Sequence, residues 1–207
     1  MPEDIPIYPD TTLRTSLQFA ALDRLKGLDT VAVWEKSDTH IAAMEGAIDV
    51  AGARSGFDMP SKAGLLDLHR VLFGGRAGAG EFRQTARQPV FRGQDCPEPQ
   101  FIGRSLDNFS NWLTAESLTE IHPIENAALV LTRIVDIWPF EFGNMTAAIM
   151  SGNVFLRQAG LAPFFVLMKD MKEFNAILAH AMLIETQPLV NAIFRTVKRE
   201  MEAIVPG

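Results

Sequence analysis

The sequence predicts an all-α fold, a bundle of helices interrupted by one short β-hairpin. Apolar residues recur at three- and four-residue spacing along most of the 207-residue chain, which is the period of an amphipathic helix. Capping residues such as serine and aspartate stand where these segments begin, and glycine stands where several of them end. One stretch, residues 74–99, differs because glycine and proline interrupt it repeatedly.

The helical segments follow in order along the chain. The first starts after Asp10 and ends at Gly27, and Ser61 is expected to cap the third. Gly160 is expected to end the helix that precedes it. The expected helices cover about residues 10–27, 30–51, 61–73, 101–113, 123–137, 145–159, 163–184 and 188–204. We expect residues 1–60 and the core, residues 61–207, to form one compact unit.

Residues 81–93 are the candidate for the β-hairpin, because an extended stretch lies there between glycines and prolines. The glycines of residues 74–80 superficially resemble a phosphate-binding loop. They lack the Lys-Ser/Thr pair and the following helix that such a loop needs. We therefore interpret them as a mobile connection into the hairpin.

Composition excludes several classes of function. The chain is 47% apolar with a formal net charge of -6, which argues against a nucleic acid as partner. The single cysteine, Cys96, can form neither an internal disulfide nor a thiolate metal site, and it fits a reducing cytosol. The N-terminal MPEDIPIYPD lacks the regions of a signal peptide, and no apolar run is long enough to span a bilayer. These features predict a cytoplasmic protein with no membrane partner.

The most informative stretch is IWPFEFGNMT, residues 137–146, which connects two predicted helices. Pro139 disfavours the α region for Trp138, so the preceding helix is expected to end at Ile137. Gly143 tolerates a positive φ, and Asn144 is expected to be the N-cap of the next helix.

The start of that next helix is a candidate anion site formed by Gly143, Asn144, Met145 and Thr146. Its first N–H groups lack intrahelical partners and lie at the positive end of the helix dipole. The side chains give little support, because Met145 crowds the backbone and Thr146 supplies no cation. Residue types alone favour an apolar connection with Trp138, Phe140 and Phe142 packed inward.

The four histidines do not suggest a metal or catalytic centre. His122 is expected to be a surface or capping residue, and His69 and His180 are expected in the core. His40 is expected to be solvated. No metal, Walker or nucleophile-elbow spacing is present.

The segment HPIENAALVLTRIVDIWPFEFGNMTAAIMSGNVFLRQAG, residues 122–160, resembles the core of the Fic domain. The family signature there is H-P-F-x-[D/E]-G-N-G-R-x-x-R, between two long helices. Further resemblance lies in HRVLFGGRAGAGEFRQ, AAMEGAI and QPLVNAIF, so it extends over most of residues 40–200. The resemblance implies a Fic-type helical bundle whose relatives transfer AMP from ATP to a protein hydroxyl.

The signature is degenerate in this chain. The resemblance puts the general base at Trp138, whose indole cannot accept a proton, and the Mg²⁺-binding acid at Phe142. Its second glycine falls on Met145, and its two phosphate-binding arginines fall on Thr146 and Ile149. Four positions match the signature, namely Pro139, Phe140, Gly143 and Asn144. Glu141 stands at the position where the signature is variable. Glu141 is a possible substitute for the lost acid.

Two further regions have implied roles. Glu45 and Gly46 resemble the end of the family's inhibitory helix, whose glutamate normally pairs with the arginine that is Ile149 here. The β-hairpin falls where the family has its flap, which pairs with a peptide strand of the target protein. The expected docking residues are Arg83, Arg87, Gln88, Pro89 and Val90. The alternative for this segment is a solvated edge hairpin.

The leading hypothesis is a Fic-like protein without transferase activity that binds a partner protein or a second copy of itself. One alternative is a divergent nucleotidyl- or phosphotransferase that uses Glu141 or backbone amides. Another is a nucleotide sensor that binds at Asn144 without turnover. No cofactor and no metal ligand set is expected, and ATP with Mg²⁺ enters only with the transferase alternative.

Overall fold

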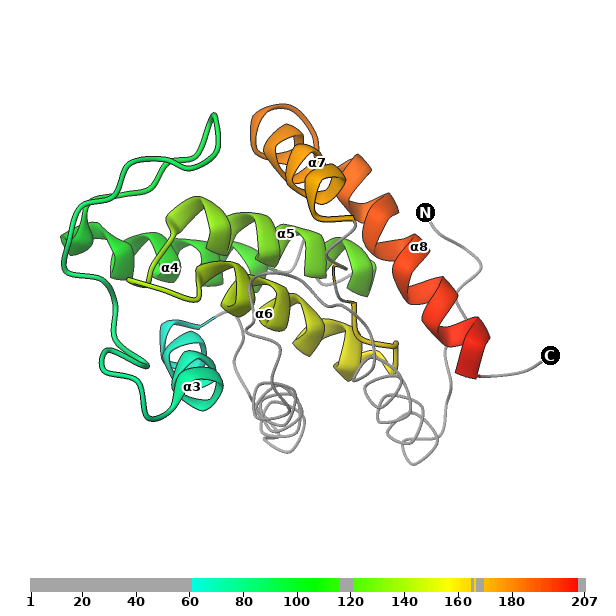
Figure 1. The fold of residues 1–207 in the computed structure, drawn as a ribbon, viewed down its shortest axis with the longest axis horizontal. Helices are drawn as coiled ribbons and strands as arrows, with labels where there is room; N and C mark the ends of the chain where they lie inside the picture. The colour runs from blue at the N-terminus through cyan, green and yellow to red at the C-terminus, as the bar shows by residue number, and fades with distance from the viewer. Residues whose placement is uncertain (1–60, 116–120, 165, 167–169, 205–207) are drawn as a thin grey trace.

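The structure is a computed structural model that describes residues 61–115, 121–164, 166 and 170–204. Within these ranges it contains six α-helices and no β-strand (Figure 1). The helices are α3 (Lys62–Phe73), α4 (Pro99–Leu113), α5 (Pro123–Ile137), α6 (Asn144–Gln158), α7 (Met171–Leu183) and α8 (Gln187–Ile204). The two N-terminal helices expected before residue 60, with His40, Glu45 and Gly46, lie outside the described residues.

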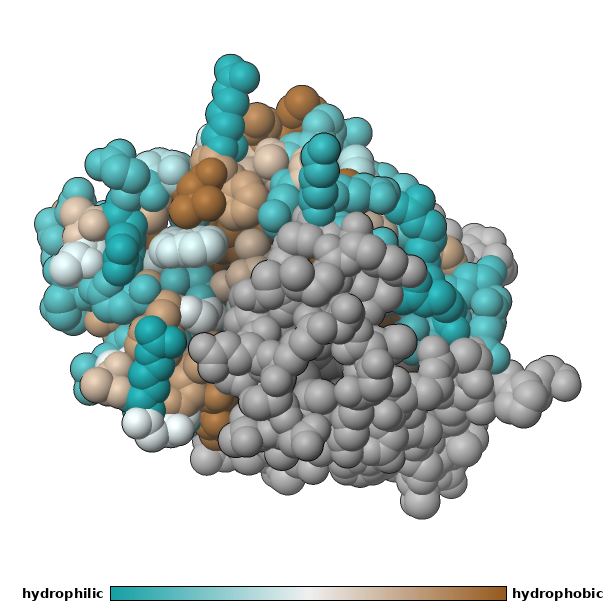
Figure 2. Space-filling view, in the orientation of Figure 1, coloured by the Kyte–Doolittle hydropathy of each residue, from teal (hydrophilic) through white to brown (hydrophobic). Residues whose placement is uncertain are grey.

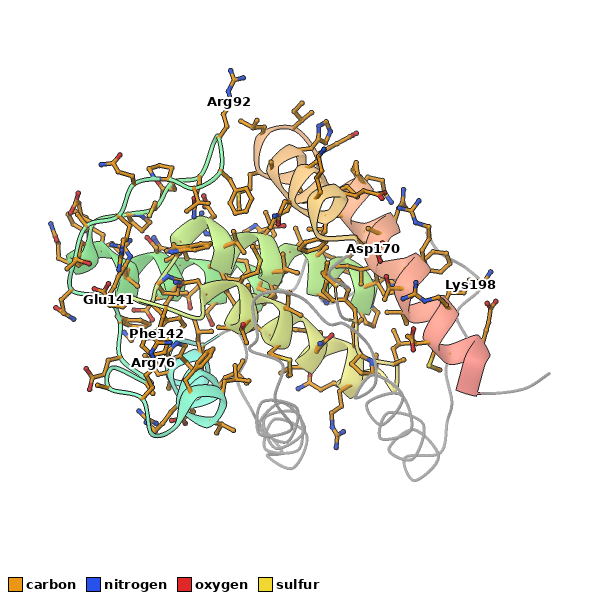
Figure 3. All side chains as sticks on the ribbon, viewed as in Figure 1. Arg76, Arg92, Glu141, Phe142, Asp170 and Lys198 are labelled. Atoms are coloured by element: carbon orange, nitrogen blue, oxygen red, sulfur yellow. The ribbon has the colours of Figure 1, made fainter. Side chains whose placement is uncertain are left out.

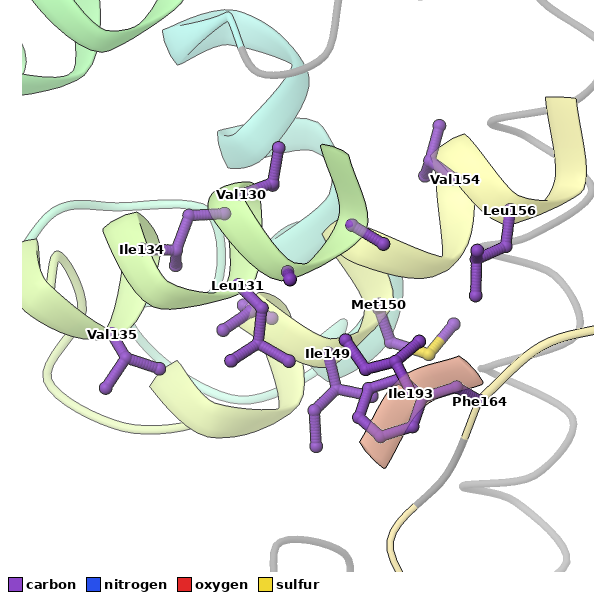
Figure 4. Close-up of a cluster of buried hydrophobic side chains, with 14 of the residues drawn as sticks. Val130, Leu131, Ile134, Val135, Ile149, Met150, Val154, Leu156, Phe164 and Ile193 are labelled. Atoms are coloured by element: carbon purple, nitrogen blue, oxygen red, sulfur yellow. The ribbon is translucent and has the colours of Figure 1, made fainter. Parts of the chain in front are cut away.

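The α5–α6 pair forms the centre of the bundle. The two helices approach closely because small residues line their contact: a Cβ on Gly152 would lie 3.0 Å from the carbonyl oxygen of Ala127. Around this seam large apolar side chains such as Leu131, Ile149 and Ile193 are fully buried (Figure 4). Because α3, α4, α7 and α8 all contribute to the same core, the loop between α5 and α6 is held on a rigid base.

Local signals in the sequence explain where these helices begin and end. The Ser61 hydroxyl accepts the N–H of Gly64, and His122 Nδ1 accepts the N–H of Ile124. Pro99 and Pro123 stand in the first turn of their helices, and Gly160 has a φ of +74° just after α6. The expected capping roles of Ser61 and His122 and the stop at Gly160 are therefore confirmed.

One helix is shorter than predicted. The pattern predicts a helix from residue 163, whereas α7 begins at Met171. The side chain of Asn153 in α6 accepts the N–H of Phe164 and donates to its carbonyl oxygen, at 2.9 and 3.0 Å. Both backbone groups of Phe164 are thereby bonded to α6, so this residue does not belong to a helix.

The predicted β-hairpin over residues 81–93 does not form in the described structure, and the segment is irregular. Three of its backbone donors bond to the loop after α5: Arg83 N–H to Pro139, and the N–H groups of Gln84 and Thr85 to Glu141. Val90 N–H bonds to the nearby Gln94 side chain. A hairpin would need these groups for pairing between its own two strands. We call residues 81–95 the flap segment.

The flap segment runs along one side of the molecule and ends beside α7 (Figure 1). Its contact with α7 is close, because a Cβ on Gly93 would lie 2.5 Å from Leu183 Cδ2. Hydrophilic residues cover much of the visible described surface, and apolar residues gather near this corner (Figure 2). None of the described helices has both the length and the apolar character needed to cross a bilayer.

Candidate functional site

The candidate site is the loop between α5 and α6, residues 138–143. Trp138 adopts the left-handed conformation, with φ 50° and ψ 59°, and its N–H still bonds to the Ile134 carbonyl. The prediction that α5 ends at Ile137 is confirmed. Few non-glycine residues adopt this conformation, and here the following Pro139 disfavours the helical alternative.

The N-cap of α6 differs from the prediction. Gly143 occupies the cap with a φ of 69°, and Asn144 is the first residue of the helix. The buried Asn144 side chain instead holds the loop, accepting the Phe140 N–H at 2.7 Å and donating to the Phe140 carbonyl at 2.8 Å. Asparagine remains essential to the shape of the loop, but its amide is committed to protein groups.

His69 anchors the loop to α3. Its Nδ1 accepts the N–H of Gly80 at 2.9 Å, so Nε2 carries the proton and donates to the Phe142 carbonyl at 3.1 Å. The ring also stacks on Phe140, with centroids 3.7 Å apart and planes 12° apart. His69 is fully buried, which confirms the core position expected for it, whereas the His180 side chain is 41% exposed and that expectation is wrong.

Burial lowers the pKa of His69 to about 4. The Phe142 carbonyl opposes this effect by favouring the protonated ring, and the positive charge of Arg76 adds to it. The imidazole is therefore neutral at pH 7, and both of its nitrogens are engaged. It anchors the loop and has no nitrogen available for a substrate.

Phe142 stands where the Fic signature has a carboxylate, and it makes aromatic contacts instead. Its ring is half-buried and meets Phe73 edge-on, with centroids 5.4 Å apart. The guanidinium of Arg76 lies 3.7 Å from the ring centroid, in a cation–π contact (Figure 3). Phe73 also covers Gly143, where a Cβ would lie 2.3 Å from the Phe73 ring.

The other signature positions contribute to packing. Phe140 and Ile149 are fully buried, and Thr146 is 1% exposed. Trp138 and Met145 are partly buried against the same core. Among the described residues no group of three or more His, Cys, Asp or Glu side chains could hold a metal ion.

Glu141 points away from the core and binds the flap segment. Its carboxylate accepts the Thr85 hydroxyl at 2.7 Å and the N–H groups of Gln84 and Thr85, both at 3.2 Å. It also forms an ion pair with Arg87. These contacts, chiefly with Thr85 and then Arg87, lower the pKa of Glu141 to about 2. We call this set of contacts the Glu141 clasp.

Arg83 has a different role from the one expected. We expected it on the docking surface, but its side chain is fully buried and cannot reach a docked peptide. Its guanidinium donates to the carbonyl oxygens of Trp138 at 2.7 Å and Thr85 at 2.8 Å, and to Pro97. Arg83 thus links the flap segment to the end of α5. The other expected docking residues, Arg87, Gln88, Pro89 and Val90, are exposed.

Two central helices joined by a W-P-F-E-F-G-N loop, with a segment running beside it, define a helical domain with the layout of a Fic core. The model of the Fic/DOC family matches residues 60–156. Protein adenylyltransferase Fic from Nematostella vectensis is 28% identical over 141 residues, which are 67% of this chain and 33% of that protein. Protein adenylyltransferase fic-1 from Caenorhabditis elegans is 30% identical over 132 residues, 62% of this chain and 25% of that protein. The chain thus spans a third or less of these relatives.

Solved structures share the fold. A Fic-1 structure from C. elegans has a TM-score of 0.69 at 20% identity, covering 98% of this chain and 67% of that one. A Fic domain containing signaling protein from Bacteroides thetaiotaomicron has a TM-score of 0.69 at 18% identity, covering 96% of this chain and 91% of that one. IbpAFic2 covalently tethered to Cdc42 has a TM-score of 0.65 at 17% identity, covering 94% and 66%. The family match over residues 60–156 and the shared fold identify a Fic domain within this chain.

Proposed function

We propose that this Fic domain protein binds a partner protein through its flap segment and does not transfer AMP. One observation carries the proposal. The positions that serve the base, the metal and the phosphates in the Fic signature are occupied by Trp138, Phe142, Met145, Thr146 and Ile149, which pack against protein groups.

The possible substitutes for the lost groups are already engaged. The Glu141 carboxylate receives four donors from the flap segment, so a metal ion would have to displace Arg87 and Thr85. His69 uses both ring nitrogens within the protein. Loss of a general base alone costs roughly 10²–10⁴-fold in rate. Each lost charge-assisted contact to phosphate costs about 1.5–3 kcal/mol of affinity.

The flap segment has the features that suit a docked strand. The N–H groups of Ala86, Arg87 and Gln88 have no partner within the part of the chain that the structure describes. Val90, two residues after Gln88, is 65% exposed. An extended peptide could pair with these backbone groups, as in β-strand addition. The relatives that carry the name protein adenylyltransferase and the structure tethered to Cdc42 also act on or hold a protein.

Nucleotide binding tests the first half of the proposal. Thermal unfolding is measured with ATP and GTP, each with and without Mg²⁺, and labelled ATP is tested for transfer to protein. We expect no saturable stabilisation and no label, since ligand binding to the folded state alone would raise the melting temperature. Transfer that disappears in Glu141→Ala would establish the divergent transferase instead. Stabilisation without transfer would establish the nucleotide sensor.

Site-specific photocrosslinking tests the second half. A photoreactive amino acid is placed at Gln88 in the flap segment, and a matched control at Lys172 near the start of α7; both sites are exposed. We expect a discrete crosslinked partner from Gln88 alone, and loss of that product when Val90 is replaced by Asp. Equal products from both positions would contradict docking at the flap segment, and a product of twice the chain mass would identify a second copy as the partner.

A further inference from the structure

A hollow of about 510 Å³ lies between α4, α5 and the corner where α7 meets α8. Gly93 and Asp95 from the end of the flap segment help to line it, but none of its lining residues belongs to the loop of residues 138–143 or to the exposed flap residues 87–90. Its apolar wall consists of Phe109 and Trp112 from α4, Leu129 from α5, and Met182 from α7. The volume falls within the range of about 300–1,000 Å³ that is typical of ligand-binding clefts.

Exposed apolar side chains extend this wall beyond the hollow. Trp112 is 48% exposed and stacks on Phe109, with centroids 6.0 Å apart. Leu183 and Ile184, which follow Met182 in the chain, are 48% and 73% exposed. These are three of the five large hydrophobic side chains that are exposed in the described part of the chain. Figure 2 shows apolar surface at this corner of the molecule.

The acidic residues around the hollow differ in whether they have a partner. Asp136 is occupied, because it pairs with Arg133 and accepts the N–H of Asp95 at 2.6 Å. The Asp95 side chain is exposed, and its carboxylate has no partner among the described residues. Glu185 at the corner is also exposed, and the one ion-pair partner it has among the described residues is His180, at 3.9 Å.

Arg92, the basic residue that is nearest to Asp95 in the sequence, does not neutralise this negative charge. Arg92 precedes the lining residue Gly93, but its side chain projects away from the molecule at the end of the flap segment (Figure 3). Among the described residues, the charge left without a partner at the hollow is therefore negative, and it lies beside an aromatic wall.

We propose that this surface, which we call the Trp112 hollow, binds a segment of a partner protein that carries a large apolar residue with a lysine or arginine nearby. The apolar side chain fills the hollow against Trp112 and Met182, and the cation pairs with Asp95. A protein segment fits better than a small molecule, because a molecule confined to the hollow would leave Leu183 and Ile184 exposed. Tryptophan at the centre of such a patch is a common energetic hot spot.

The probe that tests this is a library of random twelve-residue peptides displayed on phage and selected on the full chain. Selected peptides are synthesised, and their affinities are measured by fluorescence anisotropy. We expect them to share a large apolar residue within a few positions of a lysine or arginine. Trp112→Ala should weaken binding about tenfold or more, and Ile184→Ser several-fold.

The matched control is Phe101→Ala, because Phe101 lies on the same helix with 46% exposure but does not line the hollow. It should leave affinity within about twofold, as expected for a residue outside the hot spot. Asp95→Asn should weaken binding and flatten its dependence on salt, since a screened ion pair is removed.

Several outcomes would overturn the assignment. One is that no peptide is enriched on the unmodified chain relative to Trp112→Ala. Another is that the selected peptides are acidic or show no charge preference. Peptides that lose binding with Gln88→Ala but keep it with Trp112→Ala would locate binding at the flap segment, so this proposal and the proposed function fail separately.

Discussion

The imidazole of His69 donates from Nε2 to the carbonyl oxygen of Phe142 across 3.1 Å, and this bond ties α3 to the loop that precedes α6. The bond depends on the neutral ring, because Nδ1 must accept the N–H of Gly80. If Nδ1 also carried a proton, two N–H donors, Nδ1–H and the N–H of Gly80, would face each other and their hydrogen bond would be lost. The loop geometry is therefore coupled to one protonation state.

His69 should make stability fall in mild acid. The unfolded chain protonates this histidine near pH 6.5, whereas burial lowers the folded pKa to about 4. The contribution is thus fully present above pH 6.5 and is lost as the pH falls from there toward 4. We expect urea unfolding to show His69→Gln as less stable than the unmodified chain at pH 7. The difference should shrink by about 1–2 kcal/mol by pH 5. A difference that stays constant with pH would contradict the buried neutral ring.

The Glu141 clasp should control the mobility of the flap segment. Glu141→Gln removes the ion pair with Arg87 and weakens the bonds to Gln84 and Thr85. We expect faster amide hydrogen exchange at Gln84 and Thr85, with little change in the exchange of α5 and α6, because the clasp is on the surface. Glu81→Gln, an exposed change in the same segment, is the control and should leave exchange unaltered. Unchanged protection in Glu141→Gln would show that the clasp is not what orders this segment.

The clasp should also persist in acid. The pKa of Glu141 is lowered to about 2, so its contribution is present above the ordinary value of 4.5 and is lost only as the pH falls toward 2. We expect protection at Thr85 to be similar at pH 7 and pH 4. Loss of protection near pH 4.5 would instead indicate an ordinary solvated carboxylate.

Arg83 should be the most important single residue for the position of the flap segment. Arg83→Met keeps the length of the side chain but removes the donors to Trp138, Thr85 and Pro97, leaving partly buried carbonyl groups without these bonds. We expect a loss of about 3 kcal/mol or more in the free energy of unfolding, measured with urea. Arg92→Met, on the exposed part of the same segment, should change it by less than about 0.5 kcal/mol. Similar values for both would contradict a structural role for Arg83.

Asn144 should stabilise the loop through its bonds to Phe140, since Gly143 and not Asn144 is the N-cap of α6. Asn144→Ala removes both bonds to the backbone of Phe140, and we expect a cost of about 2–3 kcal/mol in the free energy of unfolding. Asn111→Ala, at an exposed position of α4, should be close to neutral. A cost below about 1 kcal/mol for Asn144→Ala would indicate that the loop keeps its shape without this side chain.

The sequence predicts the parts of this fold that depend on neighbouring residues. The end of α5 and the end of α6 follow from Pro139 and Gly160, whose effects are local. The non-helical backbone of Phe164 follows from its bonds to the Asn153 side chain, which no periodicity reveals. The prediction of a β-hairpin was wrong for a similar reason. Contacts of Glu141 and Arg83 hold the flap segment against a loop that is more than fifty residues away in the sequence.

The candidate site likewise has features that the sequence reveals and features that only the structure reveals. Replacement of the signature residues at Trp138, Phe142 and Ile149 is visible in the sequence. The contact of Phe142 with Arg76 and the cover of Phe73 over Gly143 are not, since no local pattern brings these residues together. Arg83 was assigned to the docking surface because its segment falls where the resemblance has the flap, and only its backbone acceptors explain why it is buried here.

The burial of Ile149 also bears on how this protein can evolve. A return to the arginine that the Fic signature has at this position would bring a charge into a place with 0% exposure, beside Met150 and the α5 seam. An unpaired buried charge costs several kcal/mol, which is a large part of the stability of a domain of this size. That cost would arise before any phosphate was bound, so a reversion at Ile149 is opposed by folding. The folded interior thus opposes a reversal at Ile149, whereas an exposed residue of the flap segment such as Arg92 can change at little cost in stability.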